Sequence, residues 1–189
     1  LLGVLTICPQ AQGQVVRPVV RADGNQQNLL KDDAWQPYQN AFPFRRDGEV
    51  FVCDNGSDGN AKGGISQTVR LNQSSPQPIL ASIWSKAEGV GGQRDTDYSL
   101  YLDLTYTDGE PLWGQVATFK AGTHDWQRGE VRVFPAKPVR DVSFYMLLRS
   151  HSGKASFKQP RLCQIAAAKD AVIFDGLPVK PNGAGAEGF

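Results

Sequence analysis

The chain has 189 residues, 40% of them hydrophobic, and its 20 Lys+Arg against 19 Asp+Glu give a formal net charge of +1. That length supports one domain with a sizeable core and a tail at each end. The sequence has no long run of like charge, whereas a typical nucleic-acid-binding protein shows a concentrated basic stripe. No apolar run reaches the ~20 residues of a membrane-spanning helix, so we expect neither nucleic acid nor a membrane as a partner.

The first residues resemble the end of a secretory signal peptide. An apolar run, Leu1–Cys8, is followed by small residues at Ala11 and Gly13, which suits an A-x-A-like cleavage site. We interpret residues 1–13 as the remnant of a signal peptide and residues 14–24 as a leader or linker. A genuine N-terminal strand is the alternative. Export predicts a secreted, periplasmic or cell-surface location.

Two cysteines remain once Cys8 is removed with the signal peptide. In an exported protein, Cys53 and Cys163 are candidates for a disulfide between an early strand and the last strand. The alternative is a pair of buried thiols that pack as small apolar residues. We expect no metal site, because the chain has 2 His and neither cysteine has a ligand neighbour at metal-binding spacing.

Two stretches of strict alternation dominate the sequence. Ile65, Gln67, Val69 and Leu71 share one face of an extended segment over 64–71, and the alternation resumes over 79–86 after a Ser/Pro-rich turn. Such period-2 patterns on both sides of a turn predict two antiparallel neighbours in one sheet.

The same pattern continues through most of the chain. The clearest strand, 98–106, places Leu100, Leu102 and Leu104 on one face, and the turn at Asp108-Gly109 leads into the next strand. Further strands are expected at 49–53, 112–119, 130–134, 141–149, 155–157 and 161–165. About eight short strands joined by turns indicate an all-β, antiparallel β-sandwich over 25–165. Residues 166–189 lose the pattern, and we interpret them as a linker or the start of a truncated following domain.

This order of strands resembles the galactose-binding-like jelly roll, specifically the carbohydrate-binding modules of secreted polysaccharide-degrading enzymes. The stretches that carry the resemblance are Asn28–Leu30, Gly64–Val69, Ser82–Ala87, Tyr106–Gly109, Asp125–Gln127 and Ser152–Phe157. It implies a non-catalytic accessory module whose partners are a polysaccharide or glycan and a neighbouring domain of the same chain. The rival interpretation is a structural β-sandwich that packs on a neighbouring catalytic domain and binds no sugar.

The chain departs from this family at a structural calcium site. Many relatives have Phe-Asp-Asp in the closing strand, where a carboxylate helps to hold Ca²⁺, whereas this chain has Phe157-Lys158-Gln159. We therefore predict no cofactor, although Asp32 or Asp33 with backbone carbonyls would supply oxygen ligands of the kind that Ca²⁺ prefers.

A sugar-binding face needs outward aromatic rings, on which sugars stack, interleaved with polar groups. If the inner faces fill the core, the outward residues are Trp84, Lys86, Tyr101, Asp103, Tyr145 and Arg149. These six are our predicted carbohydrate-binding residues, and Trp113 is a second candidate for stacking. The alternative is structural packing, since a register shift of one residue would invert every side chain. We interpret Trp126, just before a strand, as a residue that fills the core, and Trp35 likewise as structural.

Enzyme motifs are absent from the sequence. There is no Gly-x-Ser-x-Gly elbow, phosphate-binding Gly loop or His-Glu-x-x-His pattern. The adjacent pair His124-Asp125 is more typical of a turn cap than of acid–base chemistry. Glycoside hydrolysis needs two facing carboxylates, and Asp103 is the one acid that falls mid-strand on a candidate face. We therefore predict that this segment is not an enzyme.

Overall fold

The computed structural model describes residues 26–40 and 44–165, and the backbone of short strands in the two tails. These short strands are β1 (Val19–Val20), β12 (Ile173–Phe174), β13 (Leu177–Pro178) and β14 (Ala186–Gly188). The predicted signal peptide lies outside the described residues, as do most of the leader and of the segment after residue 165. Among the residues described, no helix is long and apolar enough to cross a membrane.

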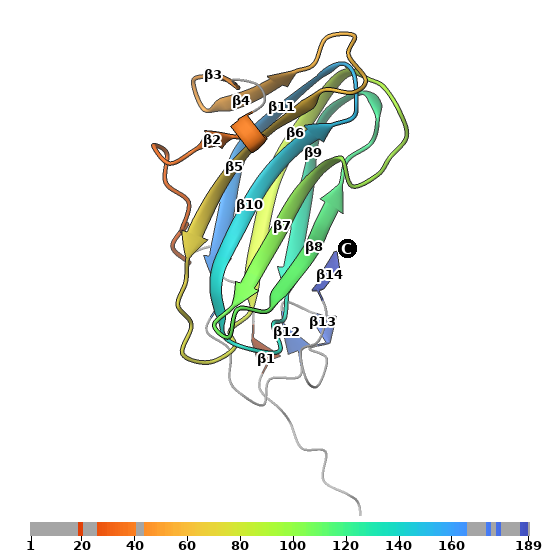
Figure 1. Ribbon diagram of the computed structural model, residues 1–189. Helices are drawn as coiled ribbons and strands as arrows, with labels where there is room; N and C mark the ends of the chain where they lie inside the picture. The colour runs from red at the N-terminus through yellow and green to blue at the C-terminus, as the bar shows by residue number, and fades with distance from the viewer. Residues whose placement is uncertain are drawn as a thin grey trace, which may run out of the picture.

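Most of the described residues form a sandwich of two antiparallel sheets (Figure 1), and β1, β12 and β13 form a small separate sheet. The five-stranded sheet has the order β2–β5–β10–β7–β8 and faces the viewer in Figure 1, and the six-stranded sheet, β14–β9–β6–β11–β4–β3, lies behind it. The strands are β2 (Gln36–Pro37), β3 (Arg45–Asp47), β4 (Val50–Asp54), β5 (Lys62–Arg70), β6 (Ile79–Val90), β7 (Tyr98–Tyr106), β8 (Pro111–Thr118), β9 (Gly122–Val133), β10 (Val139–Arg149) and β11 (Lys154–Gln164), with one 3-10 turn, η1 (Tyr38–Asn40). The all-β sandwich is confirmed. The number of strands is larger than expected, because β2 and β3 form before the first expected strand at 49–53.

The two strands that were expected to pair lie in different sheets, so that prediction is wrong. β5 pairs with β10 and β2, whereas β6 pairs with β9 and β11. The connection between them crosses from one sheet to the other and is held by the buried Gln73, whose side-chain oxygen accepts from the Val139 amide at 3.0 Å. Alternation identifies the buried face of a strand, but it does not identify the neighbour that the strand pairs with.

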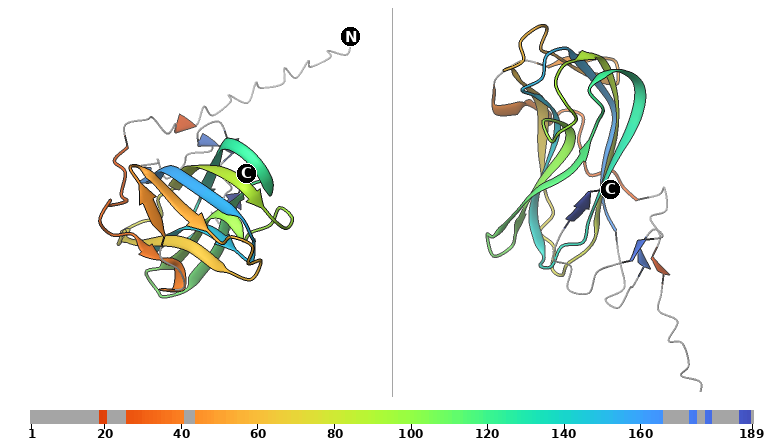
Figure 2. Two further views of the ribbon diagram at one scale, coloured as in Figure 1. Left: turned by 90° about the horizontal axis from the view of Figure 1, so that it is seen from above. Right: turned by 90° about the vertical axis from the view of Figure 1, so that its right-hand side faces the viewer.

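The predicted inner faces fill the space between the two sheets, which Figure 2 shows as separate layers. The core includes Ile79, Ala81, Ile83, Leu100, Leu102, Leu104, Val142, Phe144, Met146 and Leu148. Trp35 also belongs to the core, as predicted, and its ring meets Phe51 and Phe144 at centroid distances of 5.1 and 5.9 Å. The hairpin at Asp108-Gly109 is confirmed by the pairing of β7 with β8.

The segment before β2 is fastened to the sandwich by side-chain amides. Gln67 is buried on the inner face of β5 and exchanges two hydrogen bonds with the backbone of Lys31, at 2.7 and 2.8 Å. Asn28 bonds Pro160 O and Leu162 N, at the bulge in β11. A buried amide without such partners would destabilise the fold, so the contacts with Lys31 explain how Gln67 occupies an inward position.

The predicted disulfide is wrong, because both cysteines are free. Cys53 lies opposite Ala155 near the start of β11, and Cys163 lies eight residues farther along that strand. Strands rise ~3.3 Å per residue, so the two Cα atoms are far beyond the roughly 7 Å that a disulfide spans. Both thiols are buried, which was the alternative, and burial raises the pKa of Cys53 to about 12.

The oxygens of Asp32, which were candidate ligands for Ca²⁺, are hydrogen-bonded to an arginine. Asp32 Oδ1 and the Asp32 carbonyl accept hydrogen bonds from the Arg46 guanidinium at 3.3 and 3.2 Å. Among the described residues, no three His, Cys, Asp or Glu side chains gather as a metal site.

Candidate functional site

The six predicted binding residues do not form one surface, so the single platform is wrong. Tyr101 and Asp103 are on β7, and Tyr145 and Arg149 are on β10, all four in the five-stranded sheet. Trp84 and Lys86 are on β6 in the opposite sheet. Because each set points away from the shared core, the two sets lie on opposite sides of the sandwich.

Three tyrosines meet on the outer face of the five-stranded sheet. Tyr101 and Tyr145 are directly paired across β7 and β10, with ring centroids 6.0 Å apart. Tyr38, from η1, packs edge-on against Tyr145 at 5.8 Å. We call this surface the tyrosine face. Its members are Tyr38, Tyr101, Asp103, Trp113, Tyr145 and Arg149.

Tyr38 was not among the predicted binding residues, although it lies on this face. The short pairing of β2 with β5 carries η1 over the outer side of the sheet. Gly64 permits the close approach, since a Cβ there would lie 2.8 Å from the Tyr38 Cβ and 3.2 Å from Leu147 Cδ2. Leu147 points outward yet is buried. No local pattern at Tyr38 signals this position.

Arg149 joins the tyrosines into one cluster. Its guanidinium carbon lies 5.6 Å from the ring centroids of both Tyr38 and Tyr101. It also donates to the Tyr38 hydroxyl at 3.1 Å and, through Nε, to Asp97 Oδ1 at 2.9 Å. The charge of Arg149 is thus balanced by Asp97, and its planar group is fixed beside the rings.

Asp103 supplies the acceptor of the tyrosine face. It is half-buried, and burial raises the pKa of its carboxyl despite the hydrogen bond of 3.1 Å from the Gly114 amide. A bulge in β8 places Trp113 and Gly114 opposite Asp103, between the pairs Leu112–Leu104 and Gln115–Leu102. Trp113 is 70% exposed, so an indole ring is available to a ligand beside the carboxylate.

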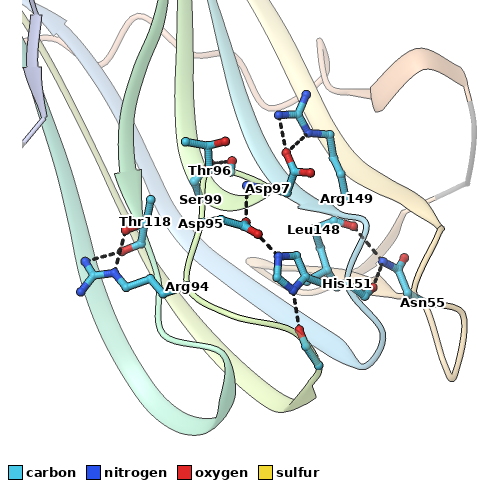
Figure 3. Close-up of polar contacts among 11 residues, drawn as sticks. Asn55, Arg94, Asp95, Thr96, Asp97, Ser99, Thr118, Leu148, Arg149 and His151 are labelled. Atoms are coloured by element: carbon cyan, nitrogen blue, oxygen red, sulfur yellow. Dashed lines mark hydrogen bonds and ion pairs between the residues drawn. The ribbon is translucent and has the colours of Figure 1, made fainter.

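A polar network at one end of the sandwich holds Asp97 in place (Figure 3). His151 is 2% exposed. Its Nδ1 is hydrogen-bonded to the Gly91 carbonyl, and its Nε2 is hydrogen-bonded to Asp95 Oδ1 at 2.9 Å. Asn55 donates to the carbonyls of Leu148 and His151 at 2.8 and 2.7 Å. The loop between β6 and β7 is thereby tied to the end of β10, and it presents Asp97 to Arg149.

This network predicts a pH-dependent stability. Burial disfavours the charged imidazole of His151, yet the Gly91 carbonyl and the Asp95 carboxylate outweigh it and raise the pKa of His151. A raised folded-state pKa stabilises the protein fully below the unfolded value, about 6.5, and this contribution disappears as the pH rises through the folded-state value. We expect the unfolding free energy to fall over that interval in the natural chain and to change less in His151→Gln.

The measurement is chemical denaturation at a series of pH values from mildly acidic to mildly alkaline. Asp95→Asn keeps the histidine and removes its carboxylate partner, so this variant should also flatten the profile. Equal pH slopes in all three proteins would contradict the assignment.

The outer face of the six-stranded sheet carries two tryptophans. Trp84 lies opposite Arg128 on β9 and Lys158 on β11. Trp126 was expected in the core, and that prediction is wrong: a bulge in β9, between the pairs Ser85–Gln127 and Ala87–His124, leaves Trp126 partly exposed opposite Lys86.

The pair His124-Asp125 shows no arrangement for acid–base chemistry. His124 Nε2 is 3.3 Å from the Tyr98 hydroxyl, and its Nδ1 is 2.7 Å from the Asp125 carbonyl. The Asp125 carboxylate instead accepts from the Trp126 amide at 2.8 Å. The two side chains therefore serve local backbone and core contacts.

Comparison with known proteins gives partial likenesses. No protein-family profile matches the sequence. The tRNA nuclease WapA of Bacillus subtilis (strain 168) is 34% identical over 103 residues, which are 52% of this chain and 4% of that protein. The tRNA3(Ser)-specific nuclease WapA of Bacillus spizizenii is 33% identical over 102 residues, again 52% of this chain and 4% of that protein. The match thus spans a small fraction of these curated relatives.

Among solved structures, the enzymatically active domain of bacteriophage CBA120 tailspike protein 4 superposes with a TM-score of 0.54 at 11% identity, covering 73% of this chain and 21% of that chain. This likeness shows a shared β-sandwich fold. Carbohydrate-binding modules are also among the similar structures. The C-terminal family 22 module of Clostridium thermocellum Xyn10B gives a TM-score of 0.47 at 10% identity, over 73% of this chain and 89% of that one.

Proposed function

We propose that this chain is a non-catalytic carbohydrate-binding module of a larger exported protein, and that a polysaccharide binds across the tyrosine face. The observation that carries the proposal is the grouping of Tyr101, Tyr145 and Tyr38 around Arg149, with Asp103 beside them. Aromatic rings offer flat faces to the C–H side of a sugar ring. Ordered polar groups between such rings fix the orientation of a bound ligand.

The charges of this face favour a neutral polysaccharide. Asp97 balances Arg149 through a contact of 2.6 Å, and Asp103 is an acceptor for hydroxyl groups. The Asp103 carboxylate would repel an anionic sugar, and Arg149 would not compensate, because its charge is already paired with Asp97. The Asp97 carboxylate is held by Arg149, so it does not serve as the second carboxylate across a cleft that glycoside hydrolysis requires beside Asp103. Binding without catalysis is therefore the function that fits these residues.

A separate observation supports the proposal that the module belongs to a longer protein. The curated relatives contain a similar segment within chains of which it makes up 4%. A small β-sandwich domain within such a long chain fits the role of an accessory module that holds a neighbouring domain near a glycan.

The test is isothermal titration calorimetry of the whole 189-residue chain against soluble neutral polysaccharides, including xylans, β-glucans and galactans. We expect one class to bind. Tyr101→Ala and Tyr145→Ala should each weaken that binding at least about tenfold, or 1.4 kcal/mol, because each removes a stacking surface. Tyr145→Phe keeps the ring and should bind within a few-fold of the natural chain.

Trp84→Ala is the matched control, because it removes an aromatic ring from the opposite sheet. It should leave the neutral ligand bound, and thermal unfolding should show that every variant is folded. Lack of binding to any neutral polysaccharide, or a loss confined to Trp84→Ala, would refute the proposal and favour a structural module that packs on a neighbouring domain.

A further inference from the structure

A second aromatic cluster lies on the outer side of the six-stranded sheet. Trp84 is flanked by Arg128 and Lys158 on the neighbouring strands, and the bulge in β9 sets Asp125 and Trp126 opposite Lys86. We call this surface the tryptophan face. Its members are Trp84, Lys86, Asp125, Trp126, Arg128 and Lys158.

Two of these side chains meet above the middle strand of the cluster. Trp126 is on β9 and Lys158 is on β11, with β6 between them, so their backbones are roughly 10 Å apart. Nevertheless, the Lys158 Nζ lies 4.0 Å from the centroid of the Trp126 ring. The two side chains therefore meet over β6, where a cation–π contact joins them.

The carboxylates nearest to this cluster already have basic partners. Glu130 pairs with Arg128 and Arg132 at 2.6 and 2.5 Å, and Glu88 pairs with Lys154 at 2.6 Å. Asp125 lies 3.9 Å from Lys86.

Lys158 differs from these basic residues. Its partner is an aromatic ring, and within the described parts of the chain it forms no ion pair. Its positive charge is consequently available to an anion that approaches the tryptophan rings.

We propose that the tryptophan face binds an acidic polysaccharide, with a uronate carboxylate at Lys158 and sugar rings stacked on Trp126 and Trp84. The charge is opposite to that of the tyrosine face, where Asp103 is the acceptor. Carboxylates interspersed among the cations suit a polymer with one charge per sugar better than a densely charged polyphosphate. The two faces are on opposite sheets, so this proposal and the neutral-sugar proposal fail independently.

Isothermal titration calorimetry of the whole chain with polygalacturonate and alginate, at low and at physiological salt, tests this inference. At least one polyuronate should bind, more weakly at the higher salt. Carboxyl-reduced polygalacturonate, which keeps the sugar rings and lacks the charge, should not bind this face. Trp126→Ala should reduce the affinity at least about tenfold, and so should Lys158→Met, which keeps an apolar stem over the ring.

Lys120→Met controls for net charge, because it removes one cation from an exposed position after β8. Tyr145→Ala controls for the other face, and neither variant should change polyuronate binding. The inference is overturned if no polyuronate binds, if Lys120→Met weakens binding as much as Lys158→Met, or if single-stranded oligo(dT) binds more tightly than the polyuronates. Thermal unfolding of each variant separates lost binding from lost folding.

Discussion

Gly153→Ala is expected to lower the unfolding free energy by about 3 kcal/mol or more, one of the two largest effects that we predict. Gly153 has φ +90, a conformation that side chains rarely adopt, and an added Cβ would lie 2.4 Å from the Gly89 carbonyl oxygen and 2.8 Å from Val90 Cα. Both obstacles are backbone atoms of β6, so they cannot move without disturbing the sheet. The turn between β10 and β11 would separate from β6.

Gly109→Ala provides a matched comparison for this prediction. Gly109 has φ +93, but a Cβ there would meet nothing within 4 Å. Its substitution should cost only the backbone strain, roughly 1–2 kcal/mol. Urea denaturation of both variants measures the difference. If the two substitutions destabilise the protein equally, the close approach of Gly153 to β6 is not the cause.

Trp35→Ala should destabilise the protein by about 3–5 kcal/mol and should also weaken ligand binding at the tyrosine face. Trp35 is 7% exposed and packs on Phe51 and Phe144 between the sheets. It directly precedes β2, which leads into Tyr38. Removing the indole leaves a cavity and frees the segment that holds Tyr38 against Tyr145.

Trp113→Ala separates these two effects. Its side chain is 70% exposed, so its loss should change stability by at most ~0.5 kcal/mol, and any loss of affinity would reflect direct contact with the ligand. Denaturation and calorimetry on both variants provide the comparison. A Trp35→Ala protein that is destabilised yet binds normally would show that Tyr38 keeps its place without this anchor.

The two outer faces of the sandwich differ in the charge that they offer to a ligand. Each outer face combines aromatic rings with charged groups, but the acceptor is Asp103 on one side and the cation is Lys158 on the other. A module built in this way would recognise two glycan types at once. Linked binding of this kind raises the overall affinity where one material presents both ligands.

The sequence by itself determined which face of each long strand is buried. Alternate residues of the long strands are buried as predicted, namely Ile79, Ala81, Ile83, Leu100, Leu102, Leu104, Phe144, Met146 and Leu148. The turn at Asp108-Gly109 joins two paired strands. These features are local: a period of two in the side chains and a turn former between the strands suffice to define them. The sandwich class follows from their repetition.

Only the tertiary structure decided which strands are neighbours. β5 and β6 look like a hairpin in the sequence, yet each pairs with strands that are distant along the chain. That choice separated Trp84 from Tyr101 and brought Tyr38 to Tyr145, whereas Cys53 and Cys163 are on neighbouring strands and are kept apart by the register of β4 along β11. The physical reason is that strand order depends on how two complete sheets bury their apolar faces together, and no residue pattern within one strand carries that information.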